Sequence, residues 1–231
     1  MANQLSLTKN QINSFDRFMV AGTSKALNTL ETMLMLKIDS SDSSIEIASA
    51  VNSEKIKHLG SKPLYSISSQ MAGELQGSLH LLMRSSDFKS LGEVMKPLLK
   101  LLFLSSTDAD LATLENQKPD WMQDDDKPHK DESAFYEQMM DVLTEMGNLL
   151  FGVYTRAIYM IYDLHTYQYF IESLRDPDQQ PIQQILSSSE LSAQQHIIIE
   201  NEFNVLGNPI KFWCLISPTQ KSFQDILNRI D

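Results

Sequence analysis

The sequence predicts an α+β fold in which a duplicated helix–strand unit, with pseudo-two-fold symmetry, forms a mostly antiparallel sheet flanked by long helices. Two long segments carry apolar residues at three- and four-residue steps, a spacing typical of amphipathic helices. Short apolar runs bounded by turn residues lie between them and indicate strands. Because the strands come in groups, without a regular βαβ alternation, we expect an antiparallel sheet.

The first half of the chain should begin with a helix over residues 8–36, where apolar residues recur at the helical period. The serine-rich residues 40–44 predict a turn, since serine side chains compete with the main chain for hydrogen bonds. Ser85, Ser86 and Asp87 are typical of a helix cap. The strands expected here are residues 45–51, 64–70 and 73–83, and the capped helix is residues 88–103, with an interruption at Pro97.

The second half should begin with another long helix, over residues 134–174. A turn at residues 177–181 and a short helix near residues 182–186 are expected to follow it. The remaining expected elements are strands 196–201 and 209–216, joined by a hairpin at residues 206–209, and a helix that starts at Ser217 and continues to Ile230.

The two halves match each other weakly but in the same order. Residues 24–27 align with residues 155–158, and residues 89–91 align with residues 221–223. Each copy alone would leave a sheet face uncovered, so the two copies should share one core. The sequence therefore predicts a single domain over residues 1–231.

Between the copies, residues 105–132 have a different character. Asp, Asn, Gln, Lys and Pro dominate this segment, and residues 124–132 carry almost no apolar side chain. A segment with so little apolar content does not build a core. We expect an acidic insertion or linker here, with repeat one before it at about residues 7–104 and repeat two after it at about residues 133–231.

The chain is acidic, with 19 Lys and Arg against 30 Asp and Glu and a formal net charge of −11. Such a chain has no long-range attraction for phosphate backbones or anionic lipids. We therefore expect neither nucleic acid nor a membrane surface as a partner. The N-terminus lacks a signal-peptide pattern, and no apolar run approaches the roughly 20 residues of a membrane helix, so the expected location is the cytoplasm.

The common catalytic and metal-binding motifs are missing from the sequence. It contains no glycine-rich dinucleotide or phosphate loop and no GxSxG elbow, and its five histidines lack the spacing of a zinc site. The aspartates at residues 124–126 lack the alternating ligands of a calcium loop, and Cys214 lies in an apolar run that favours a buried, inert thiol. The sequence therefore predicts no metal and no cofactor bound by the protein itself.

One polar constellation remains, on the helix expected over residues 134–174. Asp141, Glu145 and Asn148 are spaced by four and three residues, which places them on one face of a helix. This polar stripe extends to Gln138, Gly152 and Thr155, and the residues expected to face the other way are Met139, Val142, Met146, Leu149 and Leu150. Gly152 would allow a partner to approach closely beside Asn148. By composition alone, the stripe is also typical of the solvated side of an amphipathic helix.

The sequence around the stripe is more specific. Asp141, Glu145 and Asn148, continuing as Gly147-Asn148-Leu149-Leu150-Phe151-Gly152, resemble the signature helix of the CheC/CheX/FliY family of chemotaxis phosphatases. The duplicated plan and residues 73–79 and 210–227 are also similar to that family. The resemblance implies a CheC-like fold and a bacterial hydrolase that removes phosphate from the aspartyl-phosphate of a CheY-like response regulator, in chemotaxis or two-component signalling.

The resemblance also implies partners. The substrate would be a phosphorylated CheY-like receiver domain, which carries its own Mg²⁺, and a CheD-type deamidase and a second copy of the chain are further candidates. The first helix has Asn13 or Ser14 and Arg17 near the place of the acid and no Glu-x2-Asn pattern, so one active face is expected. Two alternatives stay open: a non-catalytic adaptor that docks a receiver domain, a deamidase-type partner or the flagellar switch, and a structural homodimer.

The chemistry of the reaction suggests a role for each residue of the stripe. A receiver domain already holds its phosphoryl group with Mg²⁺ and a lysine, so hydrolysis lacks only a water in line with the scissile bond. The neutral carboxamide of Asn148 can accept from this water through its oxygen while its NH₂ contacts the metal shell or the phosphoryl oxygens. Glu145 would pair with the receiver's lysine and set the docking angle, and Asp141 would support the edge of the contact.

Overall fold

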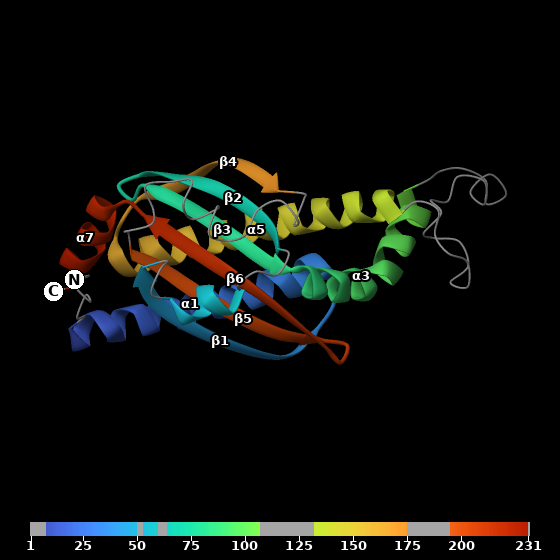
Figure 1. Cartoon of the computed structure of the whole chain (residues 1–231), viewed down its shortest axis with the longest axis horizontal. Helices are drawn as coiled ribbons and strands as arrows, with labels where there is room; N and C mark the ends of the chain where they lie inside the picture. The colour runs from blue at the N-terminus through green and yellow to red at the C-terminus, as the bar shows by residue number, and fades with distance from the viewer. Residues whose placement is uncertain (1–7, 50–52, 60–63, 107–131, 175–194, 231) are drawn as a thin grey trace.

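The computed structural model describes residues 8–49, 53–59, 64–106, 132–174 and 195–230. Helices and strands follow one another in nearly the same order in both halves of the chain (Figure 1). The elements are α1 (Lys9–Leu34), β1 (Ile38–Ser49), α2 (Glu54–Leu59), β2 (Leu64–Gly73), β3 (Gly77–Arg84), α3 (Ser85–Ser106), α5 (Glu132–Tyr162), β4 (Thr166–Leu174), β5 (Gln195–Val205), β6 (Asn208–Pro218) and α7 (Gln220–Asn228).

The strands form a six-stranded sheet in the order β1-β5-β6-β3-β2-β4, and every neighbouring pair is antiparallel. Exchanging β1 with β4, β2 with β5 and β3 with β6 gives the same order read backwards. The sheet therefore has a pseudo-two-fold axis between β3 and β6, its two central strands. The predicted fold class, an antiparallel sheet built from a duplicated helix–strand unit, is confirmed.

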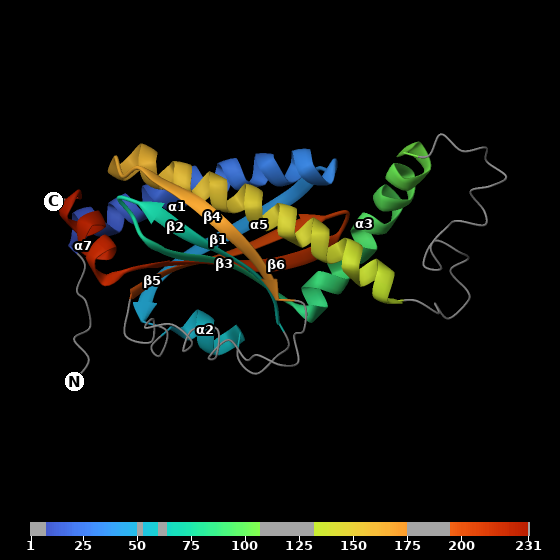
Figure 2. The same ribbon diagram turned by 90° about the horizontal axis from the view of Figure 1, so that it is seen from above.

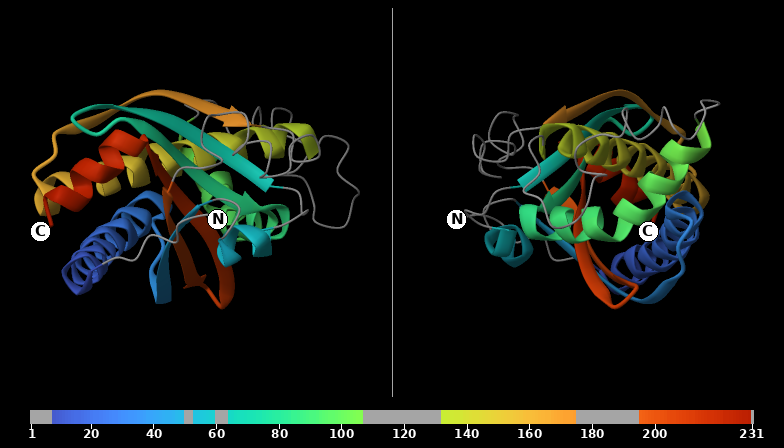
Figure 3. Two further views of the ribbon diagram at one scale, coloured as in Figure 1. Left: turned by 60° about the vertical axis from the view of Figure 1, so that its left-hand side comes forward. Right: turned by 90° about the vertical axis from the view of Figure 1, so that its right-hand side faces the viewer.

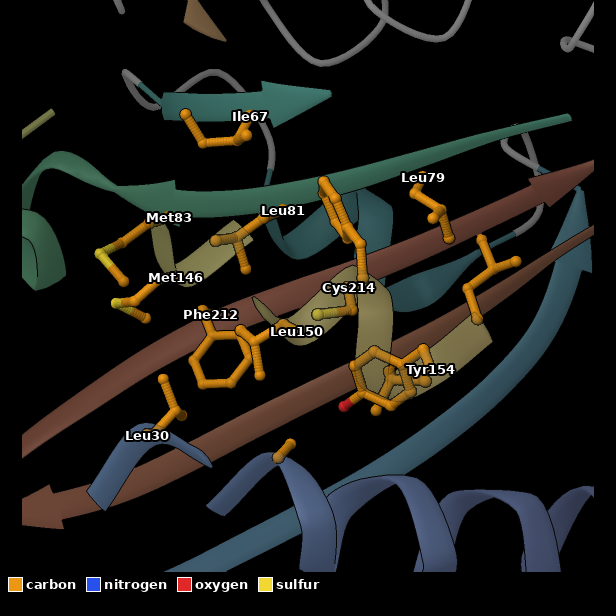
Figure 4. Close-up of a cluster of buried hydrophobic side chains, with 14 of the residues drawn as sticks. Leu30, Ile67, Leu79, Leu81, Met83, Met146, Leu150, Tyr154, Phe212 and Cys214 are labelled. Atoms are coloured by element: carbon orange, nitrogen blue, oxygen red, sulfur yellow. The ribbon is translucent and has the colours of Figure 1, made fainter. Parts of the chain in front are cut away.

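The two long helices α1 and α5 lie side by side on one face of the sheet, and α2 lies on the other (Figures 2 and 3). The main core fills the space between the sheet and this helix pair. Figure 4 shows part of it, where Leu30 of α1 and Met146, Leu150 and Tyr154 of α5 meet side chains of β2, β3 and β6. A smaller apolar cluster on the opposite face joins α2 to the sheet: Ile56, Leu59, Leu64, Leu82, Ile198, Trp213 and Leu215.

Local sequence explains where several elements begin and end. Thr8 and Gln11 form a reciprocal capping box at the start of α1, and Met35 ends that helix in the left-handed conformation. The predicted hairpin is confirmed, because only Leu206 and Gly207 separate β5 from β6 and both have positive φ. A two-residue turn of this kind matches the twist of the strands that it joins.

The helix predicted over residues 134–174 is wrong in its last third. The helix α5 ends at Tyr162, Asp163 has a positive φ of 52°, and residues Thr166–Leu174 form the edge strand β4. This strand pairs with β2 over most of its length, between Ser66 and Gly73. Sheet hydrogen bonds to a distant strand override a local spacing that suits a helix equally well.

Of two further predicted interruptions, the turn at residues 40–44 is wrong, and the interruption at Pro97 is a bend and not a break. The serines at residues 40–44 form no turn but belong to β1, where Ser43 Oγ lies 3.0 Å from Asn201 Oδ1 and donates to it. The side chains of residues 42–48 on this edge strand are exposed or half-buried, so its polar residues keep their contact with water. The helix α3 continues through Pro97 to Ser106, but its ribbon bends sharply partway along (Figures 1 and 3), because a proline inside a helix removes a main-chain hydrogen bond and crowds the preceding turn.

Some predictions fall outside the described residues. These are the course of the acidic insertion, including the aspartates at residues 124–126, and the turn and short helix expected at residues 177–186. The repeat boundaries at about residues 7–104 and 133–231 stay predictions, since they depend on that insertion. Within the described residues, no helix combines the length and hydropathy that a membrane span requires.

Candidate functional site

The helix α5 carries the predicted polar stripe on a face that is turned away from the core. Asp141, Glu145 and Gly152 are exposed along this face, and Asn148 and Gln138 are half-buried at its margin. The opposite face is buried against the sheet and α1, through residues that include Met139, Leu143, Met146 and Leu150. An amphipathic helix of this kind gains its stability from the buried face, which leaves the outer face free for other contacts.

Glu145 and Asn148 are neighbours on this outer face, since positions three residues apart lie one turn above each other on a helix. Neither side chain points into the core: Glu145 is exposed, and Asn148 is half-buried. Asp141 lies one turn before Glu145 and is exposed as well. An acid and an amide therefore stand next to each other where a partner protein can reach both.

Asn148 is held by a residue that the sequence did not single out. The Nε2 atom of Gln168, on β4, donates to Asn148 Oδ1 at 2.6 Å and to the main-chain oxygen of Asn148 at 3.2 Å. This contact could not be predicted from the sequence, because residues 166–174 were expected to continue the helix. The β-branched and aromatic residues at positions 166–171 are the sequence signal that favours a strand. In the structure Tyr167 and Tyr169 are exposed, and Gln168 lies half-buried between them.

The two glycines around Asn148 have different surroundings. A Cβ atom at Gly147 would lie 2.8 Å from Ile67 Cγ2, so this glycine lets α5 lie close against β2. A Cβ atom at Gly152 would meet nothing within 4 Å. The space beside Asn148 at Gly152 is therefore open, as expected, whereas the packing role of Gly147 was not anticipated.

Two residues of α5 do not lie where the sequence predicted. Thr155 is only 7% exposed, and its Oγ1 donates to the main-chain oxygen of Phe151 at 2.9 Å, so it does not belong to the exposed stripe. Leu149 was expected to face the core but is 39% exposed. Each residue turns the helix by about 100°, so Leu149 stays near the centre of the outer face while Thr155 drifts toward the buried side.

Leu149 adds an apolar surface to the candidate site. It follows Asn148 directly and lies one turn after Glu145, so it occupies the outer face between Glu145 and Gly152. The site thus combines a carboxylate, an amide and an exposed leucine. A transient protein interface combines polar and apolar groups in about the same proportion as the rest of the surface, so this composition is compatible with docking.

His80, His196 and Cys214 belong to the interior, whereas His165 is exposed. His80 is buried, with its ring nitrogens 2.8 Å from Ser68 Oγ and 2.9 Å from Ser78 Oγ; burial and the neighbouring His196 lower the pKa of His80 to about 4. Burial raises the pKa of the Cys214 thiol well above its ordinary value, as expected for an inert core cysteine. Among the described residues, no three His, Cys, Asp or Glu side chains gather as a metal site would require.

Comparison of the sequence with protein-family models gives no match, and neither does comparison with curated proteins. Comparison of the structure is more informative. FliY of Thermotoga maritima has a TM-score of 0.58 at 12% sequence identity, over 97% of this chain and 100% of the FliY chain. This chain has the FliY fold.

The same fold occurs in proteins with FliM in their names. The FliM middle domain of H. pylori has a TM-score of 0.55 at 10% identity, over 96% of this chain and 99% of the FliM chain. A chain in the FliG–FliM complex of H. pylori has a TM-score of 0.57 at 10% identity, over 96% of this chain and 100% of the other. The family resemblance inferred from the signature helix is therefore confirmed at the level of the fold.

Proposed function

We propose that this protein hydrolyses the aspartyl-phosphate of a CheY-like receiver domain, in chemotaxis or two-component signalling. The observation that carries the proposal is the placement of Glu145 and Asn148 as neighbours on the outer face of α5, where a docking protein can reach them. The FliY fold of the chain supports it, because the signature pattern lies on a long helix of a fold that FliY shares.

Asn148 would place the attacking water. Its neutral carboxamide can hydrogen-bond both the water and the phosphoryl oxygens without adding a negative charge beside the phosphate. The water oxygen attacks phosphorus, the bond from phosphorus to the aspartate oxygen breaks, and the carboxylate leaves as inorganic phosphate forms. The Mg²⁺ and the lysine that stabilise the transferred group belong to the receiver domain, which is the substrate.

Glu145 would govern docking. An exposed carboxylate one turn from Asn148 can pair with the receiver's lysine and so fix the angle at which α5 approaches the phosphate. Asp141 extends the acidic surface by one turn, and Leu149 and Gly152 supply an apolar contact and open space. Thr155 has no part in this contact, because it is buried.

The test is the rate of phosphate loss from a labelled receiver domain, measured with the wild-type protein and with Asn148→Ala. We expect the variant to lose about 100-fold in rate, the magnitude associated with misplacing a reacting group. Asn13→Ala is the matched control, since Asn13 is an exposed asparagine on α1, and its rate should equal that of the wild type. Equal rates for Asn148→Ala and the wild type would contradict the proposal.

A second candidate function is that of a non-catalytic adaptor, which docks a receiver domain, a deamidase-type protein or a component of the flagellar switch. The occurrence of this fold in the FliG–FliM complex of H. pylori favours it. A stable complex with a phosphorylated receiver domain, without release of phosphate, would identify this function. Binding of a CheD-type deamidase and formation of a homodimer stay predictions, and the same binding experiments can test both.

A further inference from the structure

The side-chain amide of Gln168 contacts Asn148 at two points. Gln168 reaches from β4 to α5 and donates from Nε2 to two oxygens of Asn148, the side-chain Oδ1 at 2.6 Å and the main-chain oxygen at 3.2 Å. Because side chains alternate along a strand, Gln168 lies half-buried against α5 while Tyr167 and Tyr169 are exposed. The edge strand β4 thus provides a hydrogen-bond donor that restrains the side chain of Asn148 on α5.

The main-chain bond determines how both amides are oriented. A main-chain oxygen can only accept, so the atom of Gln168 that faces Asn148 must be the NH₂ nitrogen. The same nitrogen faces the Asn148 side chain, whose nearer atom is therefore Oδ1 and not Nδ2. The Nδ2 of Asn148 is consequently turned away from Gln168, and Oδ1 keeps one lone pair for a second donor.

A glutamine at this place also carries a cost in stability. The Oε1 atom of Gln168 is buried and has no hydrogen-bond partner among the described residues. An unpaired buried acceptor destabilises a protein, because it has lost its hydrogen bonds to water. A leucine would avoid that cost but would lose both hydrogen bonds to Asn148, so what the glutamine adds at this place is its contact with Asn148.

We propose that Gln168 is a positioning residue that holds the Asn148 carboxamide ready for the attacking water, an inference that rests on the proposed function. An asparagine at the edge of an exposed helix face otherwise samples several side-chain rotamers. When Gln168 selects one rotamer before the receiver docks, the entropy lost by fixing the side chain is no longer part of the activation barrier. Gln168 itself touches neither the water nor the phosphate and acts only through Asn148.

The first test is the rate of the full-length Gln168→Leu variant with a labelled receiver domain. We expect kcat to fall about tenfold at unchanged KM, because positioning affects the reaction step while Glu145 still governs docking. The double variant Asn148→Ala/Gln168→Leu should be no slower than Asn148→Ala, since Gln168 acts through Asn148. Gln70→Leu, at an exposed glutamine on the neighbouring strand β2, is the matched control and should behave as the wild type.

The second test needs no activity. The side-chain NH₂ of Asn148, assigned in an NMR spectrum by its loss in Asn148→Ala, should be rigid in the wild type and mobile in Gln168→Leu. An unchanged kcat together with a rigid NH₂ in Gln168→Leu would overturn the inference. A double variant that is slower than Asn148→Ala by the full effect of Gln168→Leu would overturn it as well. If Asn148→Ala is as fast as the wild type, the proposed function fails, while the NMR result still shows whether Gln168 holds the amide.

Discussion

The helices α1 and α5 hold equivalent places in the two repeats, yet only one of them presents a candidate site. Their inner faces are alike: Phe15 and Phe18 of α1 pack against Tyr154 and Tyr162 of α5 within one core. Their outer faces differ. In the alignment of residues 24–27 with residues 155–158, Ser14 of α1 corresponds to Glu145 of α5, and Arg17 corresponds to Asn148.

The difference follows from how strongly each face is constrained. A change on an inner face creates a cavity or a clash and costs several kcal/mol in cases such as Phe→Ala. A change on an outer face alters stability by about 0.5 kcal/mol or less. The two repeats can therefore keep a common fold while their outer faces diverge, and a site can persist on α5 without a counterpart on α1.

Reversing the charge of Glu145 should affect docking on α5 more than any other change at the outer faces of the two helices. The Glu145→Lys variant sets a lysine against the receiver's lysine, so KM should rise by roughly 30-fold or more, with kcat at saturation little changed. The excess in KM should shrink at higher salt, because exposed charges are screened. The control is Asp16→Lys, at an exposed acid of α1; an equal rise in KM there would show that the two helices do not differ in docking.

A smaller effect is expected from two glycines of α5 with opposite surroundings. Gly147→Ala should destabilise the protein by about 1–3 kcal/mol, because the new Cβ would lie 2.8 Å from Ile67 Cγ2. Gly152→Ala should stabilise it by up to about 1 kcal/mol, since alanine favours a helix and nothing lies within 4 Å. Urea unfolding measures both. Two changes of the same sign would show that α5 does not pack as closely at Gly147 as the structure indicates.

The smallest effect is expected from moving the acid–amide pair to α1. Ser14→Glu/Arg17→Asn, made in a protein that also carries Asn148→Ala, should recover less than about a tenth of the wild-type rate, because positioning as well as residue type supports such a step. The labelled-receiver assay measures it. Recovery of most of the wild-type rate would show that the outer faces of α1 and α5 are interchangeable once they carry the same two residues.

Much of the fold could be predicted because its signals are local. The apolar spacing of α1 and of most of α5, the hairpin at Leu206 and Gly207 and the repeated order of elements are all legible in the sequence. The strand β4 could not be predicted from the sequence, because residues 166–174 suit a helix and a strand about equally well in isolation. Its pairing with β2, which begins about 100 residues earlier in the chain, selects the strand.

The candidate site also has one part that could be predicted from the sequence and one part that could not. The spacing of Asp141, Glu145 and Asn148 places them on a common face without any knowledge of the fold, because the helical period is a property of the backbone. The burial of Thr155 and the exposure of Leu149 could not be derived from spacing alone. They depend on where the sheet and α1 cover the flanks of α5.

The duplicated plan, the excess of acidic residues and the alignment of an acid with an amide on one helix can all be derived from residue type and period without the structure. Only the tertiary structure decided which flank of α5 is open and which residue holds Asn148. Gln168 is 20 positions away in the sequence and reaches Asn148 only because the pairing of β4 with β2 sets that strand beside α5. Such a contact follows from long-range strand pairing, which no local pattern specifies.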